Sequence, residues 1–267
     1  VLINHNIRKN SFNEAKKVKL ILKKNKINLT VLSNQHQIKK NIQSTAREIR
    51  YKMLLQYCKK KGIKKILTAH NLEDQVETFF IRLSRGSGLT GLSAMRDVTR
   101  LNQKVKLYRP LLDVKKKFLV EISKKTFGSY IKDPSNKNKK YLRTKIRTLK
   151  APLKKSGIDY DQIIKSINNL ASSRETLDDL LTKASTETIR KFKDKILINR
   201  SKFNDYNKEF KIRLINQSIK IIKKNYYNPR SKKVVKLIET LDRPNFKKYT
   251  LGGCVFLGEK DKICVKR

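Results

Sequence analysis

The chain has 267 residues, of which 66 are Lys or Arg and 22 are Asp or Glu, so its formal net charge is +44. No apolar run approaches the roughly 20 residues of a membrane-spanning helix, which excludes a transmembrane protein, and the recurrent Ile, Leu, Val and Phe argue against a purely disordered basic tail. So large a charge calls for a polyanionic partner, with nucleic-acid phosphates as the first candidate. A compositional bias of the source genome is the alternative, because Lys, Ile and Asn are all abundant.

The predicted elements alternate between strands and helices through the first part of the chain. Ser44 is the predicted cap of one helix and Gly62 its stop. This alternation predicts an α/β domain with a Rossmann-like parallel sheet. Ligands of such sheets lie beyond the carboxyl ends of the strands, which places His5 and the run Thr68-Ala69-His70 where chemistry is expected. In chain order we predict a strand at 1–5, a helix at 11–25, a strand at 27–33, a helix at 44–61, a strand at 64–69 and a helix from Asn71.

Beyond about residue 150 the sequence changes to long helical patterns with polar faces. We therefore predict an α/β catalytic domain at residues 1–150 and a mainly helical substrate-binding domain at 151–267, with the boundary accurate to about ten residues. Within the second domain we predict helices at 158–192 and 202–225 and a small β-rich end at 245–266.

The cysteines and histidines do not predict a disulfide framework or a zinc site. Three of each are too few and too scattered for a set of disulfides or a zinc site. We interpret Cys58, Cys254 and Cys264 as packing residues, and a reducing, cytoplasmic compartment is the default.

The segment 67–95, LTAHNLEDQVETFFIRLSRGSGLTGLSAM, holds the densest group of chemistry-bearing residues. With Asn71 as N-cap, its apolar residues share one helix face, and Asp74 and Glu77 lie together on the opposite face. Two such carboxylates can hold Mg²⁺ or a substrate ammonium group. Carboxylates near a helix start also serve capping and the helix dipole alone, and the residues by themselves leave both readings open.

Arg82 and the run Arg85-Gly86-Ser87-Gly88 follow that helix. Glycines beside a serine and two arginines favour an anion site, because backbone amides can turn inward while guanidinium groups neutralise phosphate. Gly86 can equally be a helix C-cap.

The run from Thr68 to Met95 resembles the signature of bacterial tRNA(Ile)-lysidine synthetases, which are PP-loop (N-type) ATP pyrophosphatases. Four further segments resemble motifs of that family in the same order. The resemblance covers residues 1–150 well and continues more loosely to the end. The four segments are residues 1–8 (the HxxR strand), 46–51 (the AR..RY helix), 109–112 (RPLL) and 133–147 (D.SN…R..IR).

One motif of the family is not in the sequence. Its ATP loop, S-G-G-x-D-S, follows the first strand, whereas the first glycine of this chain is Gly62 and its methionines are Met53 and Met95. We therefore expect a fragment or processed chain whose first strand and ATP loop lie upstream, and which binds ATP poorly or not at all as it stands.

The resemblance implies a ligase that uses ATP, with Mg²⁺, to adenylate C2 of the wobble cytidine in an isoleucine tRNA with anticodon CAU. The ε-amine of L-lysine then displaces AMP to form lysidine. By resemblance, Asp74, Glu77 and Arg147 are the catalytic residues, with the carboxylates holding the lysine ammonium or Mg²⁺. The nucleotide-binding candidates are His70, Arg82, Arg85, Gly86, Ser87 and Gly88, and the tRNA-binding candidates are Arg47, Arg50, Arg109, Arg143, Lys232 and Lys233.

Several alternatives remain open at this level. His70 is as often a structural residue as a ligand, and Arg47, Arg50 and Tyr51 divide between tRNA contact and packing. A tRNA thiocytidine synthetase is the nearest rival enzyme, although the Cys-x-x-Cys pairs of such enzymes are absent here. A non-catalytic basic RNA-binding protein of the same fold is the second rival. The oligomeric state is open, a homodimer included.

Overall fold

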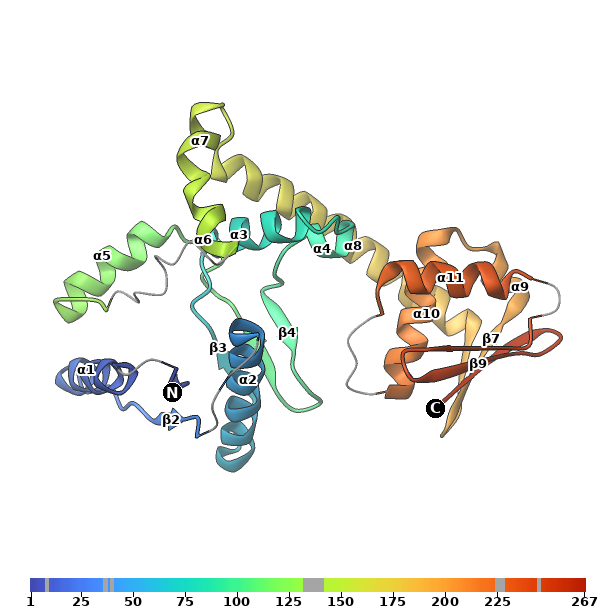
Figure 1. Cartoon of the computed structure of the whole chain (residues 1–267), viewed down its shortest axis with the longest axis horizontal. Coiled ribbons are helices and arrows are strands. Elements are labelled where there is room, and N and C mark those ends of the chain that lie inside the picture. Colours follow the sequence, from blue (N-terminus) through green and yellow to red (C-terminus); the bar gives the residue numbers. More distant parts are fainter. Residues whose placement is uncertain (8–9, 36–37, 39–40, 132–141, 224–228, 244–245) are drawn as a thin grey trace. The chain divides into compact units, whose positions relative to one another are not determined.

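The computed structural model describes residues 1–7, 10–35, 38, 41–131, 142–223, 229–243 and 246–267. These residues form two compact units, Val1–Ala171 and Ser172–Arg267 (Figure 1). The division falls inside helix α8 (Tyr160–Thr188), whereas the boundary expected from the sequence lies before that helix begins. Within the described parts of the chain, no helix is both long and apolar enough to cross a membrane.

The first unit contains two small sheets. In one, β1 pairs in parallel with β2 through the crossover helix α1. In the other, β5 lies between β3, to which it is parallel, and β4, to which it is antiparallel. The parallel pairs confirm the predicted α/β class, while the β4–β5 pairing was not predicted. The bounds are β1 Leu2–Asn4, α1 Ser11–Lys24, β2 Val31–Ser33, β3 Lys65–Leu67, β4 Val98–Arg100 and β5 Lys106–Tyr108.

The helices of this unit begin and end where local capping allows. Helix α2 starts at Ile42 after Asn41, whose φ is 48°, so the prediction of Ser44 as cap is wrong: its hydroxyl donates back to the Asn41 carbonyl over 2.9 Å. Asparagine tolerates this left-handed backbone better than most residues. Gly62, with φ 67°, ends the helix as predicted. The helices are α2 Ile42–Lys61, α3 Leu72–Leu83, α4 Leu89–Leu92, α5 Lys116–Phe127, α6 Leu142–Thr148 and α7 Lys150–Lys155.

Two hydrophobic clusters hold the first unit together. Cys58 of α2 packs with Ile66 of β3 and Leu107 of β5, which seats the helix on the second sheet. Val76 of α3 is fully buried in a separate cluster that includes Ile167 of α8. Because α3 is anchored through this apolar face, its polar residues are held in place relative to α8.

The second unit is built on an antiparallel sheet in the order β6-β7-β10-β9-β8. Strands β8 to β10 confirm the predicted β-rich end. Two further strands were not predicted: β6 lies at the end of the predicted helix 158–192, and β7 lies between the two predicted helices. The predicted helix 158–192 therefore ends at Thr188, and the one at 202–225 is divided into α9 and α10. The bounds are β6 Ile189–Lys191, β7 Lys195–Asn199, α9 Arg200–Asp205, α10 Lys208–Lys223, α11 Ser231–Leu241, β8 Lys248–Leu251, β9 Cys254–Gly258 and β10 Lys262–Lys266.

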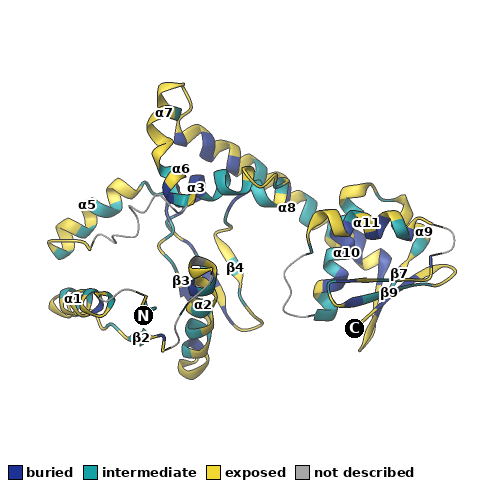
Figure 2. Ribbon diagram, viewed as in Figure 1, coloured by how far each residue is buried: buried dark blue, intermediate teal, exposed yellow. Residues whose placement is uncertain are grey.

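One face of this sheet packs against helices α9, α10 and α11 in a continuous core, whose members are among the buried positions of Figure 2. Phe203, Leu214 and Phe256 are among its fully buried side chains. All three cysteines are unpaired and buried, as expected for packing residues.

Candidate active site

The N-terminus of α3 is closed by a reciprocal pair of hydrogen bonds. The amide of Asp74 donates to Asn71 Oδ1 and the amide of Asn71 donates to Asp74 Oδ2, each over 3.1 Å. This is a capping box, in which each residue satisfies a backbone donor of the other. The capping role left open by the sequence therefore applies to Asp74, whose side chain is half-buried.

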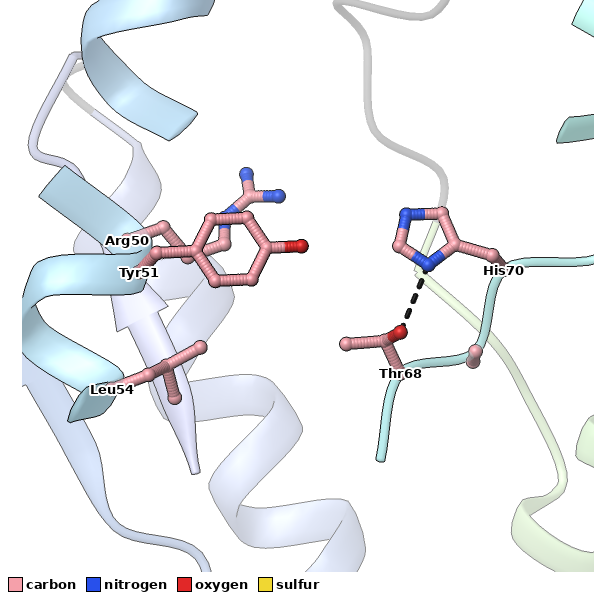
Figure 3. Close-up of a pocket in the computed structure, with 6 residues that line it drawn as sticks. Arg50, Tyr51, Leu54, Thr68 and His70 are labelled. Carbon is pink, nitrogen blue, oxygen red and sulfur yellow. Dashed lines mark hydrogen bonds between the residues drawn. The ribbon is translucent and has the colours of Figure 1, made fainter. Parts of the chain in front are cut away.

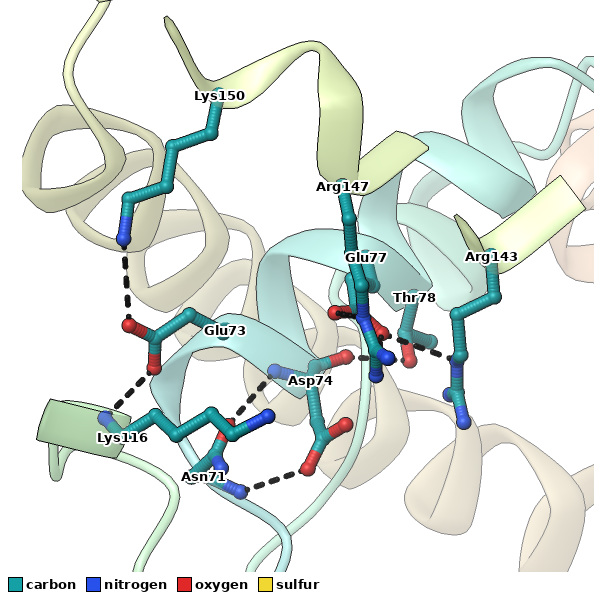
Figure 4. Close-up of polar contacts among 9 residues, drawn as sticks. All are labelled: Asn71, Glu73, Asp74, Glu77, Thr78, Lys116, Arg143, Arg147 and Lys150. Carbon is teal, nitrogen blue, oxygen red and sulfur yellow. Dashed lines mark hydrogen bonds and ion pairs between the residues drawn. The ribbon is translucent and has the colours of Figure 1, made fainter. Parts of the chain in front are cut away.

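Glu77 lies one turn further along α3 and is buried, with 2% of its surface exposed. Figure 4 shows it facing two arginines of α6. Arg147 Nε contacts Glu77 Oε1 at 2.5 Å and its Nη2 contacts Oε2 at 3.2 Å, while Arg143 Nε lies 3.2 Å from Oε2. Both carboxylate oxygens are thus engaged, and Glu77 fastens α6 to α3.

Two opposing effects act on the pKa of Glu77, its burial and its pairing with Arg147. Burial raises the pKa of Glu77, and the hydrogen bond and charge of Arg147 oppose that rise. Asp74 also raises the pKa of Glu77, which places the two carboxylates within electrostatic reach of each other. In return, the hydrogen bond to Glu77 raises the pKa of Arg147.

Asp74 and Glu77 differ in their contacts, and their joint binding of one ligand stays a prediction. Both oxygens of Glu77 bind arginine, and no group of three or more metal-binding side chains gathers among the described residues. A Mg²⁺ site made by this pair stays a prediction. Asp74, with one oxygen in the capping box, is the member of the pair better placed for a ligand.

A cavity of about 250 Å³ lies between α2 and the segment that follows β3. Arg50, Tyr51 and Leu54 line one side, and Thr68, Ala69 and His70 line the other (Figure 3). The Thr68 hydroxyl contacts His70 Nδ1 at 2.9 Å and so orients the ring. The cavity stands at the carboxyl end of a parallel strand, where ligands of such sheets bind. The sequence had already placed Thr68, Ala69 and His70 there, whereas Leu54 was not predicted to line a site.

The surroundings of His70 are strongly cationic. Burial lowers its pKa most; Asp74 acts in the opposite direction, and Arg109, Arg47 and Arg143 lower the pKa further. Burial, with a smaller contribution from Arg50, also lowers the pKa of His5. Both imidazoles are therefore neutral near pH 7, and the arginines around them supply positive charge to any anion in the cavity.

Arg109, predicted as an RNA contact, is instead buried, with 6% of its surface exposed. Its Nη1 donates to the Arg96 carbonyl at 2.6 Å and to Thr99 Oγ1 at 2.9 Å. These bonds join the end of β5 to the β4 strand and the residues before it. Burial lowers the pKa of Arg109. In this structure the side chain joins two strands, and its role as an RNA contact stays a prediction.

The segment 82–94 is held together by bonds within itself. Arg82 Nη1 donates to the carbonyls of Gly91 and Ala94, each over 2.7 Å. Gly86 has φ 64°; its amide donates to Leu83 and the amide of Ser87 donates to Arg82. This is a Schellman end of α3, so the capping alternative holds for Gly86. A phosphate role for Arg82, Arg85, Gly86, Ser87 and Gly88 stays a prediction.

Two residues that hold this segment in place, one of them in α3, escaped the sequence prediction. Gln75 is buried and bonds to both backbone groups of Met95, accepting at 2.8 Å and donating at 3.0 Å. Gly91 must be small, since an added Cβ would come within 2.4 Å of Ser87 Cβ. A polar residue on an otherwise apolar helix face and a glycine inside a short helix are the only signals the sequence offers for them.

The remaining predicted residues lie at the surface. Arg47 and Arg50 are exposed on α2, and the Arg47 guanidinium lies 5.0 Å from the centre of the Tyr51 ring. Lys232 and Lys233 are exposed in the first turn of α11. The Asp133-Pro134-Ser135-Asn136 motif, Arg8 and Lys224 to Tyr227 lie outside the described residues.

Comparison with known proteins points to one family. The sequence model of the PP-loop domain matches residues 1–153. A tRNA(Ile)-lysidine synthase of Wolbachia sp. subsp. Brugia malayi (strain TRS) is 32% identical over 99% of this chain and 62% of its own length. One of Anaplasma marginale (strain St. Maries) is 39% identical over 51% of this chain and 29% of its own. The chain thus spans less than two thirds of these relatives.

A solved structure is similar in fold. It is the U34-tRNA thiolase NcsA from Methanococcus maripaludis with its [4Fe-4S] cluster, with a TM-score of 0.52 and 15% sequence identity, covering 63% of this chain and 59% of that one. At this identity the likeness confirms the fold alone. The three buried cysteines here include no Cys-x-x-Cys pair.

Proposed function

Because the chain belongs to the PP-loop domain family, we propose that it serves as a tRNA(Ile)-lysidine synthetase. The reaction joins the ε-amine of lysine to C2 of the wobble cytidine in an isoleucine tRNA with anticodon CAU, at the expense of ATP, in the cytoplasm. The observation that carries this proposal is the alignment of relatives bearing that name over 99% of the chain at 31–32% identity. The charge of +44 agrees with a tRNA substrate.

The cavity beside His70 is the proposed place of the adenylation step. ATP, when bound with Mg²⁺, converts the C2 oxygen of the cytidine into an adenylate leaving group. Arg50 lines this cavity, and Arg47 and Arg143 act on His70 through their charge. Fixed cations of this kind stabilise the negative charge that develops on phosphate oxygens without reorganising. Neutral His70 is free to donate or accept one hydrogen bond.

The N-terminus of α3 is the proposed place of lysine. We assign the substrate ammonium to Asp74, which is half-buried and has an oxygen outside its capping bond. That carboxylate also accepts the proton that lysine must lose before its amine attacks. Glu77 keeps Arg147 in place at the same end of the site. The roles of Asp74, Glu77 and Arg147 thus differ, although all three are required.

The test is a modification assay on the product of the complete gene. It is incubated with an unmodified CAU-anticodon isoleucine tRNA transcript, ATP and labelled lysine, and the wobble nucleoside is analysed by mass spectrometry. We expect lysidine together with one pyrophosphate per nucleoside formed, and no product from a transcript with uridine at the wobble position. Failure to form lysidine with the CAU transcript would refute the proposal.

A further inference from the structure

The sheet of the second unit has a face that lies outside the hydrophobic core, with Cys264 buried at its centre and exposed cations around it. Successive side chains of a strand point to opposite faces, and the hydrophobic core takes Ile196, Ile198, Ile263, Val265 and Phe256 from one face. The other face, called here the outer face, therefore belongs to the alternate positions. From edge to edge these are Arg190 of β6; Lys195, Leu197 and Asn199 of β7; Lys262, Cys264 and Lys266 of β10; Val255 and Leu257 of β9; and Lys248 and Thr250 of β8.

The register arranges these residues in rows across the sheet. One row runs Arg190, Leu197, Cys264, Leu257, Lys248, with a cation at each end and an apolar centre. The neighbouring row places Lys195 directly opposite Lys266. Since adjacent strands are about 4.8 Å apart, the edge cations of the first row are roughly 19 Å apart, with the lysine pair between their strands.

The charges on the outer face are of one sign. No position of this face is acidic, and none of its cations forms an ion pair with a carboxylate within the part of the chain described. Like charges directly opposite each other on neighbouring strands destabilise a sheet. The Lys195–Lys266 pair is thus an unfavourable arrangement for the isolated protein, and an anion bridging the two lysines removes that cost.

An exposed aromatic ring stands beside this pair. Phe192, in the turn between β6 and β7, is 52% exposed, and its amide donates to the Lys195 carbonyl over 2.9 Å. The Lys195 Nζ atom lies 5.7 Å from the centre of its ring. Cations next to an exposed aromatic ring are the combination that RNA uses, phosphates on the cations and an unstacked base on the ring. An acidic protein partner would pair with the cations, but its recognition would not require the exposed ring of Phe192.

We infer that the outer face, together with Phe192, is a docking surface for the phosphate backbone of the tRNA substrate. The inference rests on the proposed function for the identity of the RNA, although the face itself is defined by charge and register. Lys195 and Lys266 contact phosphates, and Phe192 stacks on an unpaired base. The surface lies in the second unit, apart from the residues assigned above to the chemical step.

The test measures binding of the CAU-anticodon transcript to the product of the complete gene. Binding is monitored by fluorescence anisotropy at several salt concentrations. The variant Lys195→Ala/Lys266→Ala removes two phosphate contacts, so the slope of log affinity against log salt should fall by about 2. Its loss of affinity between 50 and 200 mM salt should then be about 16-fold smaller than that of the wild type. Phe192→Ala should weaken binding roughly 5- to 150-fold, as expected for one lost stacking contact.

The control is Lys220→Ala/Lys236→Ala, which removes two exposed lysines from α10 and α11, the helices packed on the opposite face of the sheet. We expect it to change the salt slope by much less. Because the paired lysines repel each other, Lys195→Ala/Lys266→Ala should unfold at the same temperature as the wild type or higher, which separates lost binding from lost folding.

An unchanged salt slope in Lys195→Ala/Lys266→Ala, or an equal fall in the control, would overturn the docking surface while leaving lysidine formation by the wild type intact. Conversely, a reduced slope in this variant supports the surface even if the wild type forms no lysidine, in which case the proposed function fails alone.

Discussion

Replacing Glu77 by glutamine tests whether this buried carboxylate holds the site together. The change keeps the shape of the side chain but removes the charge that faces Arg143 and Arg147. Removing one partner of a buried ion pair costs about 3–5 kcal/mol. Since the two arginine side chains are 40% and 31% exposed, water can solvate part of their charge, so we expect the lower end, about 3 kcal/mol.

The assay is thermal or urea unfolding followed by circular dichroism. For a unit of this size, 3 kcal/mol corresponds to a fall in Tm of roughly 6–12 °C. Glu121→Gln, on the exposed side of α5, is the matched control and should stay within about 0.5 kcal/mol of the wild type. In a double-mutant cycle with Arg147→Gln, the double variant should lose less stability than the sum of the losses of the two single variants.

The reasoning fails if Glu77→Gln is as stable as the control. If that stable variant also lost lysine transfer with unchanged tRNA affinity, Glu77 would be a direct ligand of lysine and not a residue that positions Arg147. Unfolding and transfer therefore have to be measured on the same preparation.

Three further predictions concern the same unit. Asp74→Asn keeps an oxygen for the capping box, so it should fold normally and bind tRNA while lysine transfer falls at least 100-fold; a large loss of stability would mean that the cap is its whole role. Gly91→Ala should destabilise the unit by about 1–3 kcal/mol through the clash with Ser87, whereas Gly88→Ala, which meets nothing within 4 Å, should not, and Ser87→Gly should restore Gly91→Ala in a melting experiment. The pKa values of His5 and His70 are lowered in the folded chain, so the unfolded chain binds more protons below pH 6.5, and the free energy of unfolding should decrease as pH falls through that range. The free energy of unfolding is measured by urea titration at pH 7.5 and at pH 5.5. The difference between the two values should disappear in the variant His5→Asn/His70→Asn, and a difference as large as that of the wild type would contradict the prediction.

Local rules within a few residues were sufficient for part of this protein. The alternation of strands and helices, the start of α3 at Asn71, the end of α2 at Gly62 and the place of His70 after a strand were all readable from the sequence, because capping and periodicity act over one or two turns. The same rules allowed two readings for Asp74 and Gly86. The structure realises the capping geometry at both positions.

Contacts between distant residues decided the rest. Glu77 meets Arg147 70 residues later, and no local pattern shows that this predicted catalytic residue also anchors α6. Arg109, predicted as an RNA contact, is buried, because its partners Arg96 and Thr99 lie just before and within a strand that local patterning did not reveal. The outer face exists only through strand register: five short segments contribute residues that no spacing in the sequence brings together. The net charge alone predicted a polyanionic partner, but only the tertiary structure gathers some of the lysines and arginines onto one surface.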